Sequence, residues 1–198
     1  MSVYSVSAIV TTSALRIEYE THRRVQEILD RLFYTLESIS VEFNQWDDKY
    51  AKGPGLYIAV VTGRSIDEFA DPMGSNQWPL EQSNDVLGDL DALYETAKEV
   101  ALTSDGAVVV SVDGVIHEQM VRFRDVSPEQ INPETVTASD YEAWMGARHM
   151  SALDTSKREN VISTVTLSEE TGRVTQFNRG SFLTFNRTEL GGDWNSSE

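Results

Sequence analysis

The chain has no cysteine, few lysines and no long hydrophobic run, and each of these absences removes a class of protein. Without cysteine, neither a disulfide framework nor a thiolate-bound metal centre is possible. The longest apolar runs, such as residues 107–110, are far too short to cross a bilayer, and the N-terminus lacks the pattern of a secretory signal. We therefore expect a soluble, cytoplasmic protein that has no membrane partner.

The chain is also short of positive charge, with 16 basic residues against 32 acidic ones and a formal net charge of -16. Only four of the basic residues are lysines: Lys49, Lys52, Lys98 and Lys157. This composition is similar to that of proteins from salt-in halophilic archaea, where salt screens the self-repulsion of an acidic surface. An acidic mesophilic protein is the alternative. In either case the charge argues against a nucleic-acid partner, and a polyanionic ligand would need local arginines, a helix N-terminus or a metal.

The length of 198 residues suits one domain with an N-terminal accessory segment. In that segment, residues 1–52, apolar residues recur at steps of three and four between residues 17 and 40 and predict an amphipathic helix. Residues 1–15 are weakly patterned and are a strand or a loose arm. The breaker Lys52-Gly53-Pro54-Gly55 marks the start of the main domain, residues 53–190, and a polar tail follows over residues 191–198.

The main domain alternates between strand and helix patterns. Strands are expected over residues 56–61, 107–112, 115–123, 161–167, 174–177 and 181–185. Helices are expected over residues 85–102 and 148–159, with shorter helical starts at 65–68, 127–130 and 139–142 and a loop over 71–84. This order predicts an α/β (α+β-like) fold, in which helices flank a mixed central β-sheet that contains hairpins.

Three polar motifs each lie at the end of a buried element. Asp105-Gly106-Ala107 begins a strand and offers a carboxylate that can accept a proton or bind a divalent metal. Gly146-Ala147-Arg148-His149 begins a helix, where free N–H groups and cationic side chains can bind phosphate. The hairpin Ser168-Glu169-Glu170-Thr171-Gly172 offers a hydroxyl and further carboxylates. Each motif alone also has an ordinary interpretation as a turn or a polar surface, but the three together predict a nucleotide site.

In this order the motifs resemble those of the diadenylate cyclase domain family, whose hallmarks are Asp-Gly-Ala, Gly-Thr-Arg-His-Arg and Ser-Glu-Glu-Thr-Gly. The resemblance spans roughly residues 56–180. It implies the diadenylate cyclase domain fold and the condensation of two ATP into cyclic di-AMP with release of two pyrophosphates. It also implies Mg²⁺ or Mn²⁺ as the metal, ATP as the substrate, and self-association that brings two sites face to face.

The resemblance further implies roles for individual residues. Asp105 would assist deprotonation of the ribose 3′-hydroxyl, while Arg148 and His149 would hold phosphates, and these three form the expected catalytic set. The metal would be bound by Asp105 and Glu170. The expected nucleotide-binding residues include an adenine-facing segment at 120–123, and they are Gly106, Ala107, Met120, Val121, Arg122, Phe123, Gly146, Ala147, Ser151, Ser168 and Glu169.

The chain departs from the family pattern at three positions. Ala147 replaces the motif's threonine, Met150 replaces its second arginine, and Ser104 stands where some members have a histidine. Lys157 or Arg158 is a candidate for the missing charge, and Ser151 for the missing hydroxyl. These departures leave open a second interpretation, a catalytically weak or inactive regulatory module of the same fold that binds ATP or cyclic di-AMP. An unrelated α/β interaction protein would require all three motifs to be coincidental.

Overall fold

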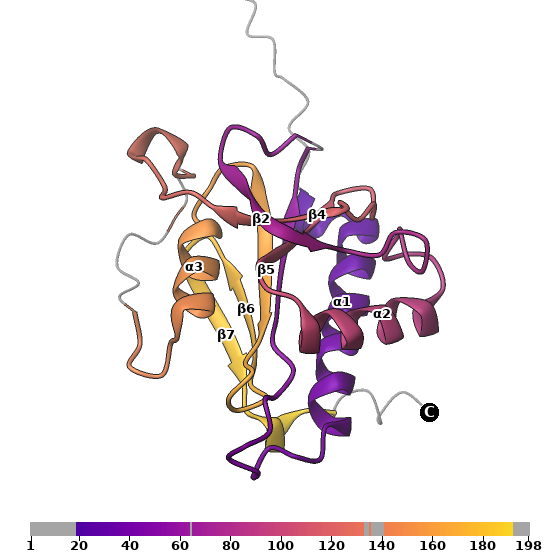
Figure 1. Cartoon of the computed structure of the whole chain (residues 1–198). Helices are drawn as coiled ribbons and strands as arrows, with labels where there is room; N and C mark the ends of the chain where they lie inside the picture. The colour runs from indigo at the N-terminus through magenta and orange to yellow at the C-terminus, as the bar shows by residue number, and fades with distance from the viewer. Residues whose placement is uncertain (1–18, 64, 133–134, 136–140, 192–198) are drawn as a thin grey trace, which may run out of the picture.

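A seven-stranded sheet with helices on both faces forms the body of the protein (Figure 1). The computed structural model describes residues 19–63, 65–132, 135 and 141–191. Its helices are α1 (Arg23–Glu42), α2 (Leu90–Thr103) and α3 (Ala147–Thr155), with short 3-10 turns at Tyr19–Thr21, Pro128–Gln130 and Arg187–Glu189. Its strands are β1 (Leu56–Val61), β2 (Ala70–Gln77), β3 (Ala107–Ser111), β4 (Gln119–Phe123), β5 (Val161–Leu167), β6 (Val174–Asn178) and β7 (Ser181–Phe185).

The strand order is β2-β4-β3-β1-β5-β6-β7, and the sheet is mixed. Among the described strands, β1 and β3 pair in parallel, with Tyr57 opposite Ala107, and the other neighbours pair antiparallel. The two central strands β1 and β3 are buried along their whole length, as expected for strands covered on both faces. The predicted α/β class with a mixed sheet and hairpins is confirmed.

Two apolar cores lie on opposite faces of the sheet. Alternate residues of β1 divide between them because successive side chains of a strand point to opposite faces. Leu56, Ile58 and Val60 join the core beneath α1 and α2, whereas Tyr57 and Ala59 join the core beneath α3. Figure 1 shows the same division, with α1 and α2 on one side of the sheet and α3 on the other.

Helix α1 packs directly on the sheet. Its inward side chains, among them Ile28, Leu32 and Leu36, lie in the same core as β1 and β5. His22 is the N-cap residue of the helix, and its side chain accepts a hydrogen bond from the Arg24 N–H. The predicted amphipathic helix is therefore present, and the segment expected to be accessory contributes a large part of one core.

Strand β2 lies where the sequence predicted a loop over residues 71–84. The proline, glycine and asparagine at Pro72, Gly74 and Asn76 made that segment resemble a loop, and in the structure Gly74 has φ +60°. The structure pairs β2 with β4 alone, at the edge of the sheet, and the pairing is irregular between Pro72 and Gln77. Edge strands tolerate proline because their outer backbone groups need no partner strand. The expectation of a loop was wrong over residues 71–77, because it relied on local composition, whereas residues 78–84 do form a loop.

Other boundaries also differ from the sequence expectations. The expected strand 115–123 is shortened to β4, and an isolated bridge pairs Ile116 with Val110. Helix α2 starts five residues later than residue 85, because Asp89 caps it by accepting from the Ala92 N–H at 3.0 Å. The expected start at 65–68 is a turn, whereas the one at 127–130 is a 3-10 helix and α3 ends at Thr155.

Some expectations fall on residues that the structure does not describe. The possible strand at residues 1–15, the helical start around Ser139 and the polar tail beyond Gly191 lie outside the described residues. Within the described part of the chain, no helix combines the length and the apolar character needed to cross a membrane.

Candidate functional site

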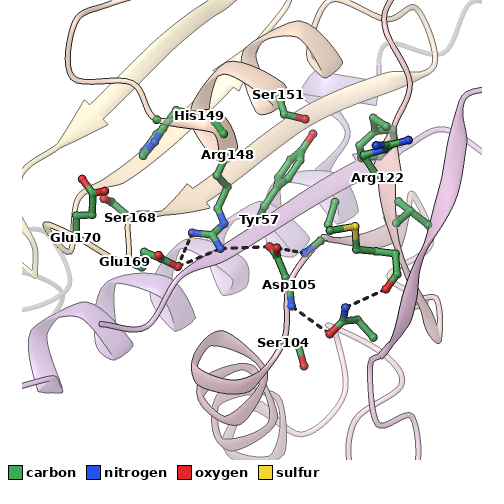
Figure 2. Close-up of a pocket in the computed structure, with 18 of the residues that line it drawn as sticks. Tyr57, Ser104, Asp105, Arg122, Arg148, His149, Ser151, Ser168, Glu169 and Glu170 are labelled. Carbon is green, nitrogen blue, oxygen red and sulfur yellow. Dashed lines mark hydrogen bonds and ion pairs between the residues drawn. The ribbon is translucent and has the colours of Figure 1, made fainter. Parts of the chain in front are cut away.

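One cavity of about 570 Å³ collects all three motifs. It lies where β1 and β3 begin, where β5 ends, and where α3 begins, so the first residues of two strands and of one helix face the same space. A volume of this size suits a nucleotide or another ligand of similar size. Figure 2 shows polar side chains entering it from these separate elements.

Nearly every residue that the sequence predicted for the site lines this cavity. They are Asp105, Gly106, Ala107, Val121, Arg122, Phe123, Gly146, Ala147, Arg148, His149, Ser151, Ser168, Glu169 and Glu170. Met120 is the exception, because its side chain is buried in the core beneath α1 and α2. Neighbouring residues of β4 alternate in direction, so Val121 and Phe123 join the opposite core and leave Met120 outside the site.

Sequence reasoning missed several lining residues. Tyr57 comes from β1, Met73 and Asn76 from β2, Lys52 from the segment before β1, and Trp144 from the segment before α3. None belongs to a recognisable motif, and β2 itself was expected to be a loop. The Lys52-Gly53-Pro54-Gly55 breaker was the one available signal, but it indicated only the end of a segment.

The backbone at Asp105 is set by the turn between α2 and β3. Gly106 has φ +102°, and a side chain there would meet Met73 and the Val121 carbonyl. Its N–H donates to Asp105 Oδ1 at 2.8 Å, and the Asp105 N–H donates to Asn76 Oδ1 at 3.3 Å. The Asp105 side chain is 66% exposed. A partly restrained carboxylate therefore stands at the mouth of the cavity.

Arg148 links the three motifs by ion pairs. Its guanidinium lies 3.6 Å from Asp105 Oδ1 and 3.3 Å from Glu169 Oε2 (Figure 2). The Arg148 side chain is only 19% exposed, and Gly55 permits its close approach to β1, because a Cβ at that position would lie 2.5 Å from a guanidinium nitrogen. Lys52 Nζ approaches the same Glu169 oxygen at 3.8 Å. Two cations and two carboxylates thus form one connected group.

The N-terminus of α3 opens toward the same cavity. Gly146 is the N-cap residue and has no side chain that could accept a hydrogen bond from the first turn. The first helical hydrogen bond runs from the Met150 N–H to the Gly146 carbonyl. The N–H groups of Ala147, Arg148 and His149 therefore have no carbonyl of the preceding turn to bind. Such a helix start favours an anion.

His149 is buried between aromatic rings. Its ring centroid lies 5.1 Å from that of Trp144 and 6.4 Å from that of Phe177, and its buried Nε2 has no hydrogen-bond partner among the described residues. Burial, followed by the nearby positive charge of Arg148 and Arg173, lowers the pKa of His149 to about 4. At neutral pH the imidazole is uncharged, so it adds no positive charge to the cavity.

The third motif is held in place by α1. Gly172, with φ +68°, closes the turn between β5 and β6, and its N–H donates to the Ser168 carbonyl at 3.0 Å. The buried Ser40 hydroxyl of α1 donates to the Gly172 carbonyl at 2.6 Å, and a side chain at Gly172 would collide with Ser40 and Trp46. Helix α1 therefore supports the hairpin that presents Ser168, Glu169 and Glu170.

Neither proposed substitute for the missing arginine reaches the cavity. Met150 packs against the core beneath α3. Lys157 pairs with Asp154 at 2.8 Å, and the buried Arg158 binds the Gln130 side chain and the Arg124 and Asp125 carbonyls. The suggestion that either residue supplies charge to the site was wrong, because the end of α3 lies away from its N-terminus. Ser151 does line the cavity.

The two expected metal ligands, Asp105 and Glu170, do not by themselves form a complete set of metal ligands. Asp105 and Glu170 both line the cavity, but Figure 2 shows Glu169 between them, and the described residues contain no group of three or more acidic or histidine side chains that could hold a metal. Mg²⁺ commonly takes one or two carboxylates and completes its shell with water and substrate phosphates. Asp105, exposed and carboxylate-bearing, fits a metal that arrives with a triphosphate.

Comparison with known proteins gives a family match. Residues 88–182, just under half of the chain, match the family described as DisA bacterial checkpoint controller nucleotide-binding. The matched segment contains all three motifs. No curated protein matches the chain.

Two solved structures are similar to this one. A hypothetical membrane spanning protein from Bacillus cereus matches with a TM-score of 0.50 and 15% identity, over 80% of this chain and 63% of that one. This chain therefore spans less than two thirds of that protein's length, and the likeness shows a common fold. A double mutant of DacA from Staphylococcus aureus matches with a TM-score of 0.47 and 14% identity, over 82% of this chain and 89% of that one.

Proposed function

We propose that this chain is a diadenylate cyclase, which condenses two ATP into cyclic di-AMP and two pyrophosphates. The observation that carries the proposal is the meeting of all three motifs in one cavity, with the Asp105 carboxylate 3.6 Å from the Arg148 guanidinium. The family match over residues 88–182 supports it. The resemblance in motif order, noted from the sequence, supplies the reaction.

The cavity offers different chemistry at its two ends, which suits a nucleotide. Val121, Phe123 and Tyr57 supply an apolar and aromatic lining on one side, which suits adenine. Arg148, Ser168 and the open N-terminus of α3 supply donors and positive charge on the other side, which suits phosphates. We infer that ATP lies across the cavity with its base toward β4 and its phosphates toward α3.

In the proposed reaction, the 3′-oxygen of one ATP attacks the α-phosphorus of another. The new 3′-O–P bond forms, the bond to the β-phosphate oxygen breaks, the hydroxyl loses its proton, and pyrophosphate leaves. Asp105 stands at the cavity mouth as the group that accepts or directs this proton, and Arg148 stabilises the charge that develops on the phosphate. A bound Mg²⁺ or Mn²⁺ would lower the pKa of the hydroxyl and neutralise phosphate charge.

Ring closure requires this transfer twice, so two sites must face each other. A single cavity of about 570 Å³ holds one ATP, and its attacking hydroxyl must meet a phosphate held by another copy. A two-fold symmetric pair satisfies this requirement, because each copy then presents the same surface to the other. The exposed Asp105 at the cavity mouth suits such an encounter.

A non-catalytic nucleotide-binding module is the second candidate. It is favoured by Ala147 and Met150, which remove a hydroxyl and a cation from the motif that would hold the phosphates. This candidate predicts that ATP or cyclic di-AMP binds without turnover.

Incubation of the purified protein with ATP and Mn²⁺ tests the proposal. The buffer should contain high KCl, since the net charge of -16 favours a salt-screened fold. We expect cyclic di-AMP by mass spectrometry, with two pyrophosphates released for each molecule formed. If a known diadenylate cyclase makes product under these conditions while this protein only binds ATP, the proposed activity is refuted and the binding module is favoured.

A further inference from the structure

One positively charged residue that lines the cavity, Lys52, lies outside the three motifs. Among the described residues that line it, the permanently charged cations are Lys52, Arg122 and Arg148. Arg122 belongs to the side assigned to the base, so Arg148 is the only cation that the motifs place on the phosphate side. A triphosphate carries several negative charges, and position 150, where the resemblance leads one to expect an arginine, holds Met150, which packs against the core beneath α3. The phosphate side therefore lacks a second cation unless another part of the chain supplies one.

Lys52 occupies the required position. Its Nζ lies 3.8 Å from Glu169 Oε2, and the Arg148 guanidinium lies 3.3 Å from the same oxygen. Two cations from separate parts of the chain thus converge on one carboxylate oxygen. A phosphate oxygen at that point would contact both cations in place of Glu169.

The backbone that carries Lys52 is fitted closely to the site. At Gly53, a Cβ would collide with the Glu169 carbonyl oxygen and with the Trp46 ring. At Gly55, a Cβ would lie 2.5 Å from the Arg148 guanidinium and 2.8 Å from Glu169 Cβ. Two glycines within four residues therefore allow this segment to lie against Glu169 and Arg148. The packing of these glycines therefore fixes the position of the backbone from which the Lys52 side chain extends.

The exposure of the Lys52 side chain suits an exchange of partners. It is 63% exposed, whereas Arg148 is 19% exposed and is held between two carboxylates. An exposed pair such as Lys52 with Glu169 contributes little to stability, so breaking it costs little. Lysine carries a compact charge with three donors on a flexible chain, which lets it follow a phosphate group.

We propose that Lys52, which comes from outside the three motifs, is a substrate-binding cation for the β- and γ-phosphates. On this proposal, which rests on the proposed function in that the ligand is ATP, the phosphates displace Glu169 from Lys52 and Arg148. Lys52 thereby distinguishes nucleoside triphosphates from monophosphates, because a monophosphate does not extend to it.

The test compares Lys52→Gln with Lys49→Gln by calorimetric titration with ATP and with AMP. Lys49 is the matched control because it is exposed, sits over the Tyr50 ring and does not line the cavity. We expect Lys52→Gln to weaken ATP binding about tenfold, as for the loss of one partly screened charge-assisted contact, and to leave AMP binding unchanged. Lys49→Gln should bind both ligands as the wild type does, and Lys52→Arg, which keeps the positive charge, should bind ATP more tightly than Lys52→Gln does.

The outcomes separate this inference from the proposed function. If wild-type protein binds ATP and Lys52→Gln binds it equally well, the role of Lys52 is refuted while the proposed function stands. Equal weakening of ATP and AMP would also refute it, because the effect would then not lie with the outer phosphates. If the wild type binds neither ATP nor AMP, the proposed function itself fails. Thermal melting of each variant confirms that the fold is intact.

Discussion

The Asp105 carboxylate and the Arg148 guanidinium lie 3.6 Å apart, although they come from different motifs on different elements. Asp105 follows α2 and Arg148 lies in the first turn of α3, on the opposite face of the sheet. The pair meets at the end of the sheet where β3 begins, which both α2 and α3 reach. A carboxylate and a guanidinium are thereby brought within reach of one ligand.

Replacing Asp105 with asparagine should separate chemistry from binding. The change keeps the shape of the side chain but removes the group proposed to accept the proton, so we expect cyclic di-AMP formation to fall by about a hundredfold or more. ATP affinity should stay the same or rise slightly, because a negative charge near the phosphates is lost. Asp30→Asn, which removes the same charge from the exposed face of α1, is the control. Full activity in Asp105→Asn would exclude Asp105 from the chemistry.

Gly55→Ala should damage the site through Arg148. The added methyl group would lie 2.5 Å from the Arg148 guanidinium, so the arginine must leave its present position between Asp105 and Glu169. Since displacement of a catalytic group by about 1 Å can cost roughly a hundredfold, we expect kcat/KM to fall by about ten- to a hundredfold. Gly63→Ala is the matched control, because nothing lies within 4 Å of the added Cβ. Equal activity of the two variants would show that the position of Arg148 is not critical.

The buried His149 should make the fold less stable in mild acid. Burial lowers its pKa from 6.5 to about 4, so between these pH values the unfolded chain binds a proton that the folded chain does not. Above pH 6.5 the histidine is neutral in both states and does not lower the free energy of unfolding. As the pH falls toward 4, the free energy of unfolding decreases by roughly 3 kcal/mol or less on account of this group. Urea unfolding at pH 7 and pH 4.5 should therefore show a smaller loss for His149→Gln than for wild type. Identical losses would mean that His149 is not buried in its neutral form.

Shortening a buried side chain of α1 should test whether this helix belongs to the main folding unit. Leu32 is buried beneath the sheet, so Leu32→Ala should lower the free energy of unfolding by about 2–5 kcal/mol. Val41→Ala, at a side chain that is 57% exposed, should change it by about 0.5 kcal/mol or less. Circular dichroism and tryptophan fluorescence should report one common transition. A separate early loss of helix signal alone would instead identify α1 as an independent accessory segment.

The sequence by itself determined much of the scaffold. The three- and four-residue spacing of apolar residues predicted α1. A buried apolar run predicted β1, a β-branched run predicted β3, and an alternating pattern predicted β5. The family resemblance, carried by the order of the three motifs, also implied most of the residues that line the cavity. Such signals are local, and each can be read without knowing what packs against it.

Only the tertiary structure decided the remaining features. Strand β2 exists because β4 pairs with it, and no local pattern records a partner supplied by distant sequence. The same applies to the burial of His149 between Trp144 and Phe177, to the exclusion of Met120, and to the meeting of Lys52 with Glu169. Each depends on the direction of a side chain relative to a neighbour far away in the chain. The sequence therefore predicted the motifs of the site. Packing decided which charged groups reach it, because it buries His149 and brings Lys52 to Glu169.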